Sequence, residues 1–309
     1  MKINNLYDFS YSLEVNSKKG LKMATVEENF WRELTEDENY KIKIIDIGAA
    51  DMEGVSPSYK ILIDLGITDI IGFEPNHEAC EALNKKNEEG SLYLPYFIGD
   101  GTSATFYETN WAPTSSLYPP NTKLLEKFHN LNELTTLIKE HQVQTHRLDD
   151  IPEIDRADFI KMDIQGSELK VLENSVNVLN TAVLVQVEVE FVELYKGQPL
   201  FADVDSFLRS KGFKFHCFDE GTGGRPFKPL MIGNDPNKKF NQALWADAYY
   251  VKDWMNLKTL SREQLVSYAI LCYSMLGSID LAHVILAHID EVYNSSFSKK
   301  FLNILLATN

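Results

Sequence analysis

Strand-like and helix-like segments alternate in a regular order through the middle of this chain, and that order limits the folds open to it. KIKIIDIG (41–48), with four isoleucines, is typical of a buried strand, and PSYKILIDLG (57–66) is typical of a helix that ends at a glycine. A second strand, DIIGFEP (69–75), and a second helix, from Asn76 to Gly90, follow. Strands joined through helices are parallel, so the sequence predicts an α/β domain.

The alternation continues to about residue 253. The further strands that we expect are LYLPYFIGD (92–100), ADFIKMDI (157–164) and AVLVQVEVE (182–190). The further helices are LLEKFHNLNELTTLIKEH (124–141), SELKVLENSVNVL (167–179) and FADVDSFLRSKG (201–212), and TNWAPTSSLYPPN (109–121) is expected to be an irregular loop. FKFHCF (213–218) and ADAYYVKD (246–253) come last with only a loop between them, which predicts an antiparallel hairpin at one edge of the sheet.

Three regions follow from this pattern: a helical segment at 1–40, a main domain at 41–255 and a helical extension at 256–309. In the first region, Val26, Phe30, Trp31 and Leu34 recur at helical spacing. In the last, a capping box of Ser261 and Gln264 begins one helix, Gly277 ends it, and Ser278 can begin a second. One helix pair cannot bury its own faces, so we expect it to pack on the main domain or to form a homo-oligomer with a second subunit.

Composition limits the partners. Asp and Glu number 45 against 30 Lys and Arg, a formal net charge of −15, and the lysine pairs are scattered, so a nucleic acid is not an expected partner. No apolar run reaches the roughly 18 residues that a membrane span requires. Cys80, Cys217 and Cys272 follow no metal-binding spacing, and free cysteines are typical of a reducing compartment, so we expect a cytoplasmic protein.

Acidic residues stand where four of the predicted strands end. They are Asp46, Glu74 (followed by Pro75), Asp100 and Asp163. In an open α/β sheet the ligand lies beyond the carboxyl ends of the strands, so these carboxylates should converge on it. Carboxylates accept hydrogen bonds from hydroxyl and amino groups and attract cations. S-adenosylmethionine offers a ribose diol, an adenine amine, an ammonium and a sulfonium, and it has no phosphate.

Two other interpretations stay open at this point. A dinucleotide would require GxGxxG after the first strand, and this chain has only Gly48 and then Gly54 there. Each acidic residue alone could equally be a helix cap or a solvated loop residue. It is the ordered set that favours the cofactor.

Several segments together resemble the FkbM-type methyltransferases. They are DIGA (46–49), IIGFEPNHEAC (70–80), IGDGTSATFY (98–107), SSLYPPN (115–121), DFIKMDIQGSELKVLENS (158–175) and LWADAYYVKD (244–253). The resemblance implies a Rossmann-like class I fold with seven mostly parallel strands, S-adenosylmethionine as donor, and O-methylation of a sugar, glycoconjugate or natural-product hydroxyl.

The resemblance also implies roles for single residues. Asp46 and Gly48 would form the loop on the methionine side, Glu74 with Pro75 would hold the ribose, Asp100 and Gly101 would flank the adenine, and Asp163 would face the donor. One departure is the run Ala50-Asp51-Met52-Glu53, which delays the next glycine to Gly54. That departure favours an alternative in which the chain is a non-catalytic binding or scaffold protein.

A hydroxyl acceptor benefits from a base that removes its proton. Asp163, His146, and Glu188 or Glu190 are the candidates, and we favour Asp163 with Glu190 as the acceptor-side carboxylates. Glu188 and Glu190 are two residues apart in a strand, so they share a face. A structural role for each of these residues is an open alternative.

The sequence also suggests where the acceptor binds. The loop 113–118 and the segment 195–199 are expected to line a site for a small-molecule or glycan acceptor, with Trp111 either stacked on it or buried in the core. No metal is expected, because Phe191 follows Glu190 where catechol-type enzymes have an Asp-Asn pair.

Overall fold

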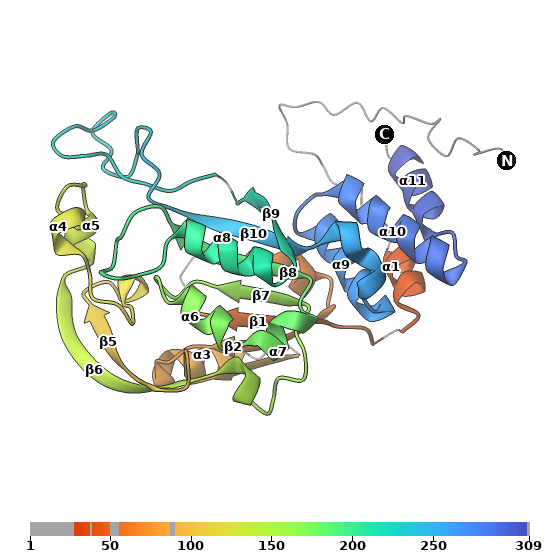
Figure 1. The fold of residues 1–309 in the computed structure, drawn as a ribbon, viewed down its shortest axis with the longest axis horizontal. Helices are drawn as coiled ribbons and strands as arrows, with labels where there is room; N and C mark the ends of the chain where they lie inside the picture. Colours follow the sequence, from red (N-terminus) through yellow and green to blue (C-terminus); the bar gives the residue numbers. More distant parts are fainter. Residues whose placement is uncertain (1–27, 38, 50–55, 87–89, 220, 308–309) are drawn as a thin grey trace.

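A seven-stranded sheet forms the centre of the computed structural model, which describes residues 28–37, 39–49, 56–86, 90–219 and 221–307 (Figure 1). Its order is β3-β2-β1-β7-β8-β10-β9. The strands are β1 (Ile42–Ile47), β2 (Thr68–Phe73), β3 (Ser91–Leu94), β7 (Phe159–Met162), β8 (Leu184–Glu190), β9 (Phe213–Phe218) and β10 (Trp245–Lys252). Only β10 runs antiparallel to its neighbours, which confirms the mostly parallel sheet with an antiparallel pair at one edge. The strand order reverses between β1 and β7.

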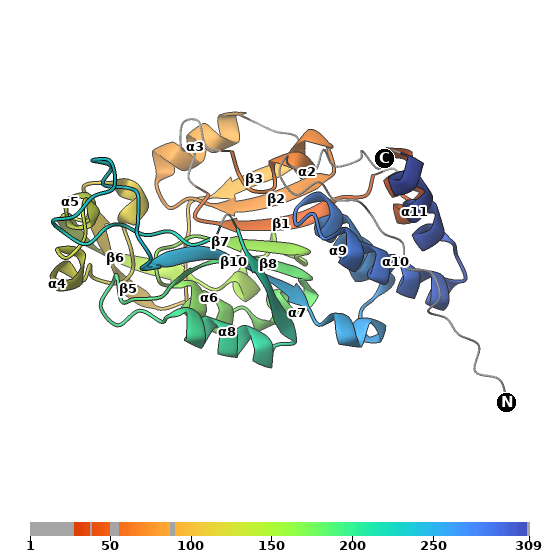
Figure 2. The same cartoon turned by 90° about the horizontal axis from the view of Figure 1, so that it is seen from above.

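Helices cover both faces of this sheet (Figure 2). On one face lie α2 (Lys60–Asp64) and α3 (His77–Lys86), and on the other lie α6 (Glu168–Glu173), α7 (Val176–Thr181) and α8 (Phe201–Ser210). Alternate residues of the central strands face each layer. Ile45, Ile160 and Val185, for example, pack against α6 to α8, while Ile44 and Phe159 face the opposite way.

The C-terminal helices pack on the amino ends of the parallel strands. They are α9 (Arg262–Ser274), α10 (Ile279–Tyr293) and α11 (Phe297–Ala307), and the 3-10 turn η3 (Trp254–Thr259) precedes them. The N-terminal helix α1 (Glu28–Thr35) packs against α9 and α11. The Ser267 hydroxyl donates to Asp158 at 2.7 Å, and the Tyr268 hydroxyl donates to the Lys252 carbonyl at 2.7 Å. Of the two packings expected for this extension, the structure therefore has the one on the main domain.

The capping box of Ser261 and Gln264 is present, but α11 was not predicted. Ser278 stands before α10 without capping it, since its hydroxyl bonds His216 instead. None of the described helices is long and apolar enough to cross a membrane. Residues 1–27, including Val26, lie outside the described residues.

Residues 97–150 form a separate small unit, which we call the insertion, in place of two of the predicted elements. The residues predicted as one strand, 92–100, form β3 and then β4 (Phe97–Ile98), and β4 belongs to a second sheet of order β4-β6-β5. Pro95 stands at the break and offers no backbone N–H for a ladder. The helix predicted at 124–141 was wrong in its second half. Only α4 (Thr122–Leu125) and α5 (Leu131–Leu134) are helical, and β6 (Leu137–His146) then pairs with β5 (Ser103–Thr109).

The insertion lies at the end of the molecule opposite α9 to α11 (Figure 1). It also carries the 3-10 turns η1 (Ala112–Thr114) and, after β6, η2 (Leu148–Asp150). Because α9 covers the amino ends of the parallel strands, the insertion stands over their carboxyl ends.

Candidate active site

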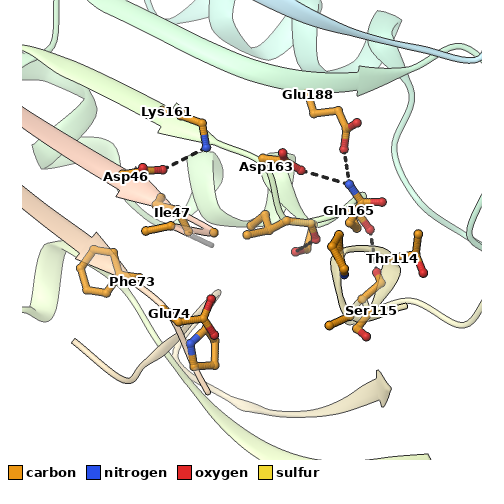
Figure 3. Close-up of a pocket in the computed structure, with 18 of the residues that line it drawn as sticks. Asp46, Ile47, Phe73, Glu74, Thr114, Ser115, Lys161, Asp163, Gln165 and Glu188 are labelled. Carbon is orange, nitrogen blue, oxygen red and sulfur yellow. Dashed lines mark hydrogen bonds and ion pairs between the residues drawn. The ribbon is translucent and has the colours of Figure 1, made fainter. Parts of the chain in front are cut away.

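A cavity of about 1280 Å³ opens at the carboxyl ends of the central strands. The ends of β1, β2, β7, β8 and β10 line it on one side, and the loop 111–117 and the small sheet line it on the other. Figure 3 shows Glu74, Asp163, Glu188 and Ser115 around the same open space. The residues that end the strands are therefore brought together, as the sequence predicted for Asp46, Glu74 and Asp163.

The first strand ends in a turn that only glycine fits. Gly48 has a φ of +84°, and a Cβ at this position would lie 2.1 Å from the carbonyl oxygen of Asp163. The end of β1 therefore packs directly against the end of β7. Residues 50–55, which include Asp51 and Gly54, lie outside the described residues.

Asp46 is buried below this turn and binds two side chains of the protein. The Tyr59 hydroxyl donates to its Oδ2 at 2.6 Å, and Lys161 Nζ donates to its Oδ1 at 3.1 Å (Figure 3). Burial alone would lower the pKa of Lys161, but the charges of Asp46 and Asp163 outweigh it and hold that pKa above its usual range. This buried ion pair fixes the floor of the cavity.

Glu74 stands at the end of β2 with half of its carboxylate engaged. Its Oε1 accepts the backbone N–H of Asn76 at 2.7 Å, and Asn76 in turn caps α3 by accepting the N–H of Ala79 at 3.0 Å. Burial raises the pKa of Glu74. Among the described residues nothing is hydrogen-bonded to Oε2, so one carboxylate oxygen is left for a ligand in the cavity.

Gln165 joins the acidic residues at the ends of β7 and β8. Its Nε2 donates to Asp163 Oδ1 at 3.0 Å and to Glu188 Oε2 at 2.6 Å (Figure 3). Its Oε1 lies 2.8 Å from the hydroxyl of Tyr195. The backbone of Gln165 has a φ of +56°, which is uncommon for a residue with a side chain. One amide thus holds two carboxylates side by side, and the sequence did not single it out.

Burial raises the pKa of the glutamates at the end of β8. Glu190 is 3% exposed and Glu168 is 2% exposed. Glu188 is half-buried, and it is accessible from the cavity. Burial raises the pKa of Glu188 well above its usual range, and the charges of Asp163 and Glu190 add to the effect. Burial, followed by the charges of Glu168 and Asp163, also raises the pKa of Glu190. These are carboxyl groups that hold a proton more tightly than usual.

The stability of the ligand-free protein is expected to fall as the pH rises through about 7. Burial raises the pKa of Glu168 to about 7 in the folded protein, whereas a glutamate in an unfolded chain titrates near 4.3. The stabilisation is present in full below the unfolded value and is lost as the pH passes the folded value, because only the folded chain keeps the proton in between. Thermal melts between about pH 5 and about pH 8 measure this.

The matched variant for that measurement is Glu168→Gln. A glutamine can still accept the backbone N–H of Ile164, which Glu168 Oε1 accepts at 2.9 Å, but it does not ionise. The fall in melting temperature should be shallower in this variant. A wild-type melting temperature that is constant or that rises over the same range would contradict the prediction.

The loop predicted to line an acceptor site is fixed to the strand ends. The Ser116 hydroxyl donates to the Gln165 carbonyl at 2.6 Å, and the Tyr195 hydroxyl lies 2.9 Å from the Thr114 carbonyl. Loop residues 113–117, Trp111 and Tyr195 line the cavity, whereas residues 196–199 do not. Trp111 is 45% exposed, so it is not a core residue.

Other predicted residues lie away from the cavity. Asp100 and Gly101 follow β4 in the small sheet and do not line it. Asp100 Oδ1 accepts the N–H and hydroxyl of Thr102, bonds that lower its pKa to about 2 together with the charge of Lys170. The ring of His146 stacks on Tyr96, with centroids 4.5 Å apart, and does not line the cavity. The break at Pro95 redirects this part of the chain.

The histidine that does line the cavity is His141. Its Nε2 lies 2.7 Å from Glu108 Oε2, across the β5–β6 pair. Within the described ranges, no group of three or more His, Cys, Asp or Glu side chains has an arrangement that could hold a metal ion.

The family model described as Methyltransferase FkbM domain matches residues 46–215. No curated protein matches the chain. One similar solved structure is magnesium protoporphyrin IX methyltransferase (ChlM) from Synechocystis PCC 6803 with bound SAM, at 10% identity and a TM-score of 0.33, over 73% of this chain and 77% of that one. Another is the 23S rRNA methyltransferase ErmE, at 11% identity and a TM-score of 0.35, over 85% and 82%. Likenesses this distant say nothing of the acceptor.

Proposed function

This chain belongs to the FkbM methyltransferase family, and we propose that it transfers the methyl group of S-adenosylmethionine to a hydroxyl oxygen of a sugar, a glycoconjugate or another natural product. The observation that carries the proposal is the group formed by Asp163, Gln165 and Glu188 in the same cavity as Glu74. In this proposal a donor-binding carboxylate and a proton-accepting group share one cavity.

The residues at the ends of β1 and β2 fit the donor. Glu74 keeps one carboxylate oxygen for the ribose diol, and Gly48 and Asp163 line the same cavity, where the carboxylate of Asp163 can attract the positively charged part of the molecule. Bound S-adenosylmethionine supplies an electrophilic methyl group on a sulfonium, and the sulfur leaves as a neutral thioether. The protein's own task is to align the acceptor oxygen with that methyl group and to exclude water.

The charge of the cavity narrows the acceptor class. Eight Asp and Glu residues line it, against four Lys and Arg residues, and one of those four, Lys161, is already paired with Asp46. An anionic acceptor would meet net repulsion there. Neutral or amine-bearing hydroxyl compounds are therefore the acceptors that we propose, with the exposed ring of Trp111 as a flat surface for a sugar ring.

Glu188 is the proton acceptor in this proposal. Its carboxylate faces the cavity next to Asp163, and the amide of Gln165 keeps the two groups in fixed positions. As the new carbon–oxygen bond forms, the acceptor hydroxyl gives its proton to Glu188. The raised pKa of this carboxyl makes it a stronger base than an ordinary glutamate.

An activity test separates the acceptor classes. The full chain is incubated with S-adenosylmethionine labelled in its methyl group and with neutral, amine-bearing and anionic hydroxyl compounds of similar size. We expect label on an oxygen of a neutral or amine-bearing compound and little on the anionic ones. Label found on nitrogen or carbon, or a preference for the anionic compounds, would overturn the proposal.

Replacing Glu74 by alanine is expected to weaken donor binding. The change removes the hydrogen bonds that the ribose hydroxyls donate to a charged carboxylate, each worth about 1.5–3 kcal/mol, so the dissociation constant should rise by roughly tenfold to 100-fold. Titration calorimetry with S-adenosylmethionine measures it. The control is Glu81→Ala, which removes a carboxylate on the exposed side of α3 that pairs with Lys85.

The two outcomes that count against this assignment have different meanings. Equal affinity in Glu74→Ala and the wild type would show that Glu74 does not hold the ribose. Failure of the wild-type chain to bind the donor at all would favour a non-catalytic scaffold that retains the fold.

A further inference from the structure

Large apolar side chains are exposed where the insertion is farthest from α9 to α11. Six of them are Trp111 (45% exposed), Leu137 (44%), Ile138 (62%), Phe227 (51%), Leu230 (67%) and Met231 (41%). The last three stand on the loop 221–244, which projects beside α4 and α5 (Figure 1). We call this surface the insertion tip. Contiguous apolar patches of this kind mark protein or membrane contacts.

Contacts between the segments show that the insertion tip is one surface. The ring of Phe227 lies 4.3 Å from that of buried Phe128, and the Lys228 N–H donates to the Lys127 carbonyl at 2.8 Å. Lys228 Nζ also pairs with Glu133 at 2.9 Å. On the other side of α5, the N–H of Asn110 donates to the carbonyl of Thr136 at 3.0 Å, which places Trp111 beside the start of β6. The loop is thus held in place with Leu230 and Met231 facing outward.

The charge of the insertion tip is opposite to that of the whole chain. Residues 122–140 and 221–244 carry five of the six side chains of the insertion tip. These two segments contain seven Lys and Arg against four Asp and Glu, a net of +3, whereas the chain as a whole is −15. The remaining residues therefore sum to −18. Lysines among exposed aromatic and aliphatic side chains are typical of surfaces that lie at the boundary of a lipid bilayer.

The positive charge of these segments favours one of two possible partners for the insertion tip. A second copy of the chain docked through the same surface would bring two positive patches together, whereas a leaflet with acidic lipids would attract each of them. We propose that the insertion tip docks on a membrane surface that contains acidic lipids. Trp111 and Arg225 also line the cavity, so docking would bring the cavity mouth to the bilayer. The inference does not depend on which acceptor is methylated.

Vesicle flotation of the full chain tests the proposal. We expect the protein to float with vesicles of phosphatidylcholine and phosphatidylglycerol, to float far less with phosphatidylcholine alone, and to be released by added salt. Leu230→Gln with Met231→Gln should lower the bound fraction by about tenfold, and Lys127→Glu with Lys238→Glu should do the same. The matched control is Val284→Gln with Val292→Gln, which changes two exposed apolar residues of α10 and should have no effect.

Two results would overturn the proposal. One is equal or absent binding to the two kinds of vesicle. The other is a concentration-dependent dimer of the wild type that Leu230→Gln with Met231→Gln dissociates, because this surface would then be covered by a second copy. Calorimetry with S-adenosylmethionine on the same variants should show unchanged donor binding, so a failure here is distinct from a failure of the proposed function.

Discussion

A chain that ends at residue 255 is expected not to fold. All ten residues of α9 from Leu265 to Ser274 are buried, and they cover the starts of β1, β7 and β8. Exposing one large core side chain costs about 1.5–3 kcal/mol, and a whole domain is stable by only about 5–15 kcal/mol. The truncated chain should show no cooperative thermal transition and should aggregate in size-exclusion chromatography.

A shorter deletion provides the control. Removing only residues 296–309 takes away α11, which packs on α1 through Phe301 and Phe30 but leaves α9 in place. This variant should keep a cooperative transition at a lower temperature. A chain ending at 255 that unfolds cooperatively near the wild-type temperature would show that α9 is an accessory helix and not part of the core.

The sequence predicted the central sheet well because its strands are buried on both faces. Continuous apolar runs such as residues 182–185, which lead into β8, are typical of strands in parallel sheets. Once β7 and β8 were parallel neighbours, the pairing of Met162 with Val187 had to place Asp163 beside Glu188. The alternation of β8 then puts Glu190 on the same face. The residues alone were therefore enough to predict the acidic group.

The insertion could not be predicted in the same way. β6 is exposed along most of its length and has no apolar face to set a period of two, so residues 137–141 seemed to continue the helix before them. What makes this segment a strand is its pairing with β5, whose residues stand 28 to 41 positions earlier in the chain. The same error hid His141, which lines the cavity, and favoured His146, which does not.

Gln165 shows a second limit of sequence reasoning. Its position two residues after Asp163 is visible in the sequence, but its role depends on a left-handed backbone that turns its amide toward Glu188. That conformation is uncommon for glutamine, and the contacts with Ser116 and Tyr195 that accompany it come from distant segments. Local propensity cannot predict a conformation that tertiary contacts impose.

Replacing Glu188 by glutamine is expected to reduce kcat by about 10²-fold to 10⁴-fold, the usual contribution of a general base. Glutamine has nearly the same shape and can still contact Gln165, but it cannot take the proton of the acceptor hydroxyl. Because Glu188 does not reach the ribose site at Glu74, the dissociation constant of S-adenosylmethionine should stay within a few-fold of the wild type. Single-turnover methylation and calorimetry measure the two quantities separately.

The pH dependence distinguishes a base from a structural residue. A carboxyl with a raised pKa is ionised in a smaller fraction of molecules at neutral pH, so the wild-type rate should rise with pH until Glu188 has lost its proton. In Glu188→Gln that rise should disappear. Gln165→Leu is the comparison, since it frees both carboxylates without removing either; it should lower kcat and keep the rise with pH. A rise that survives in Glu188→Gln and disappears in Asp163→Asn would assign the proton to Asp163 instead.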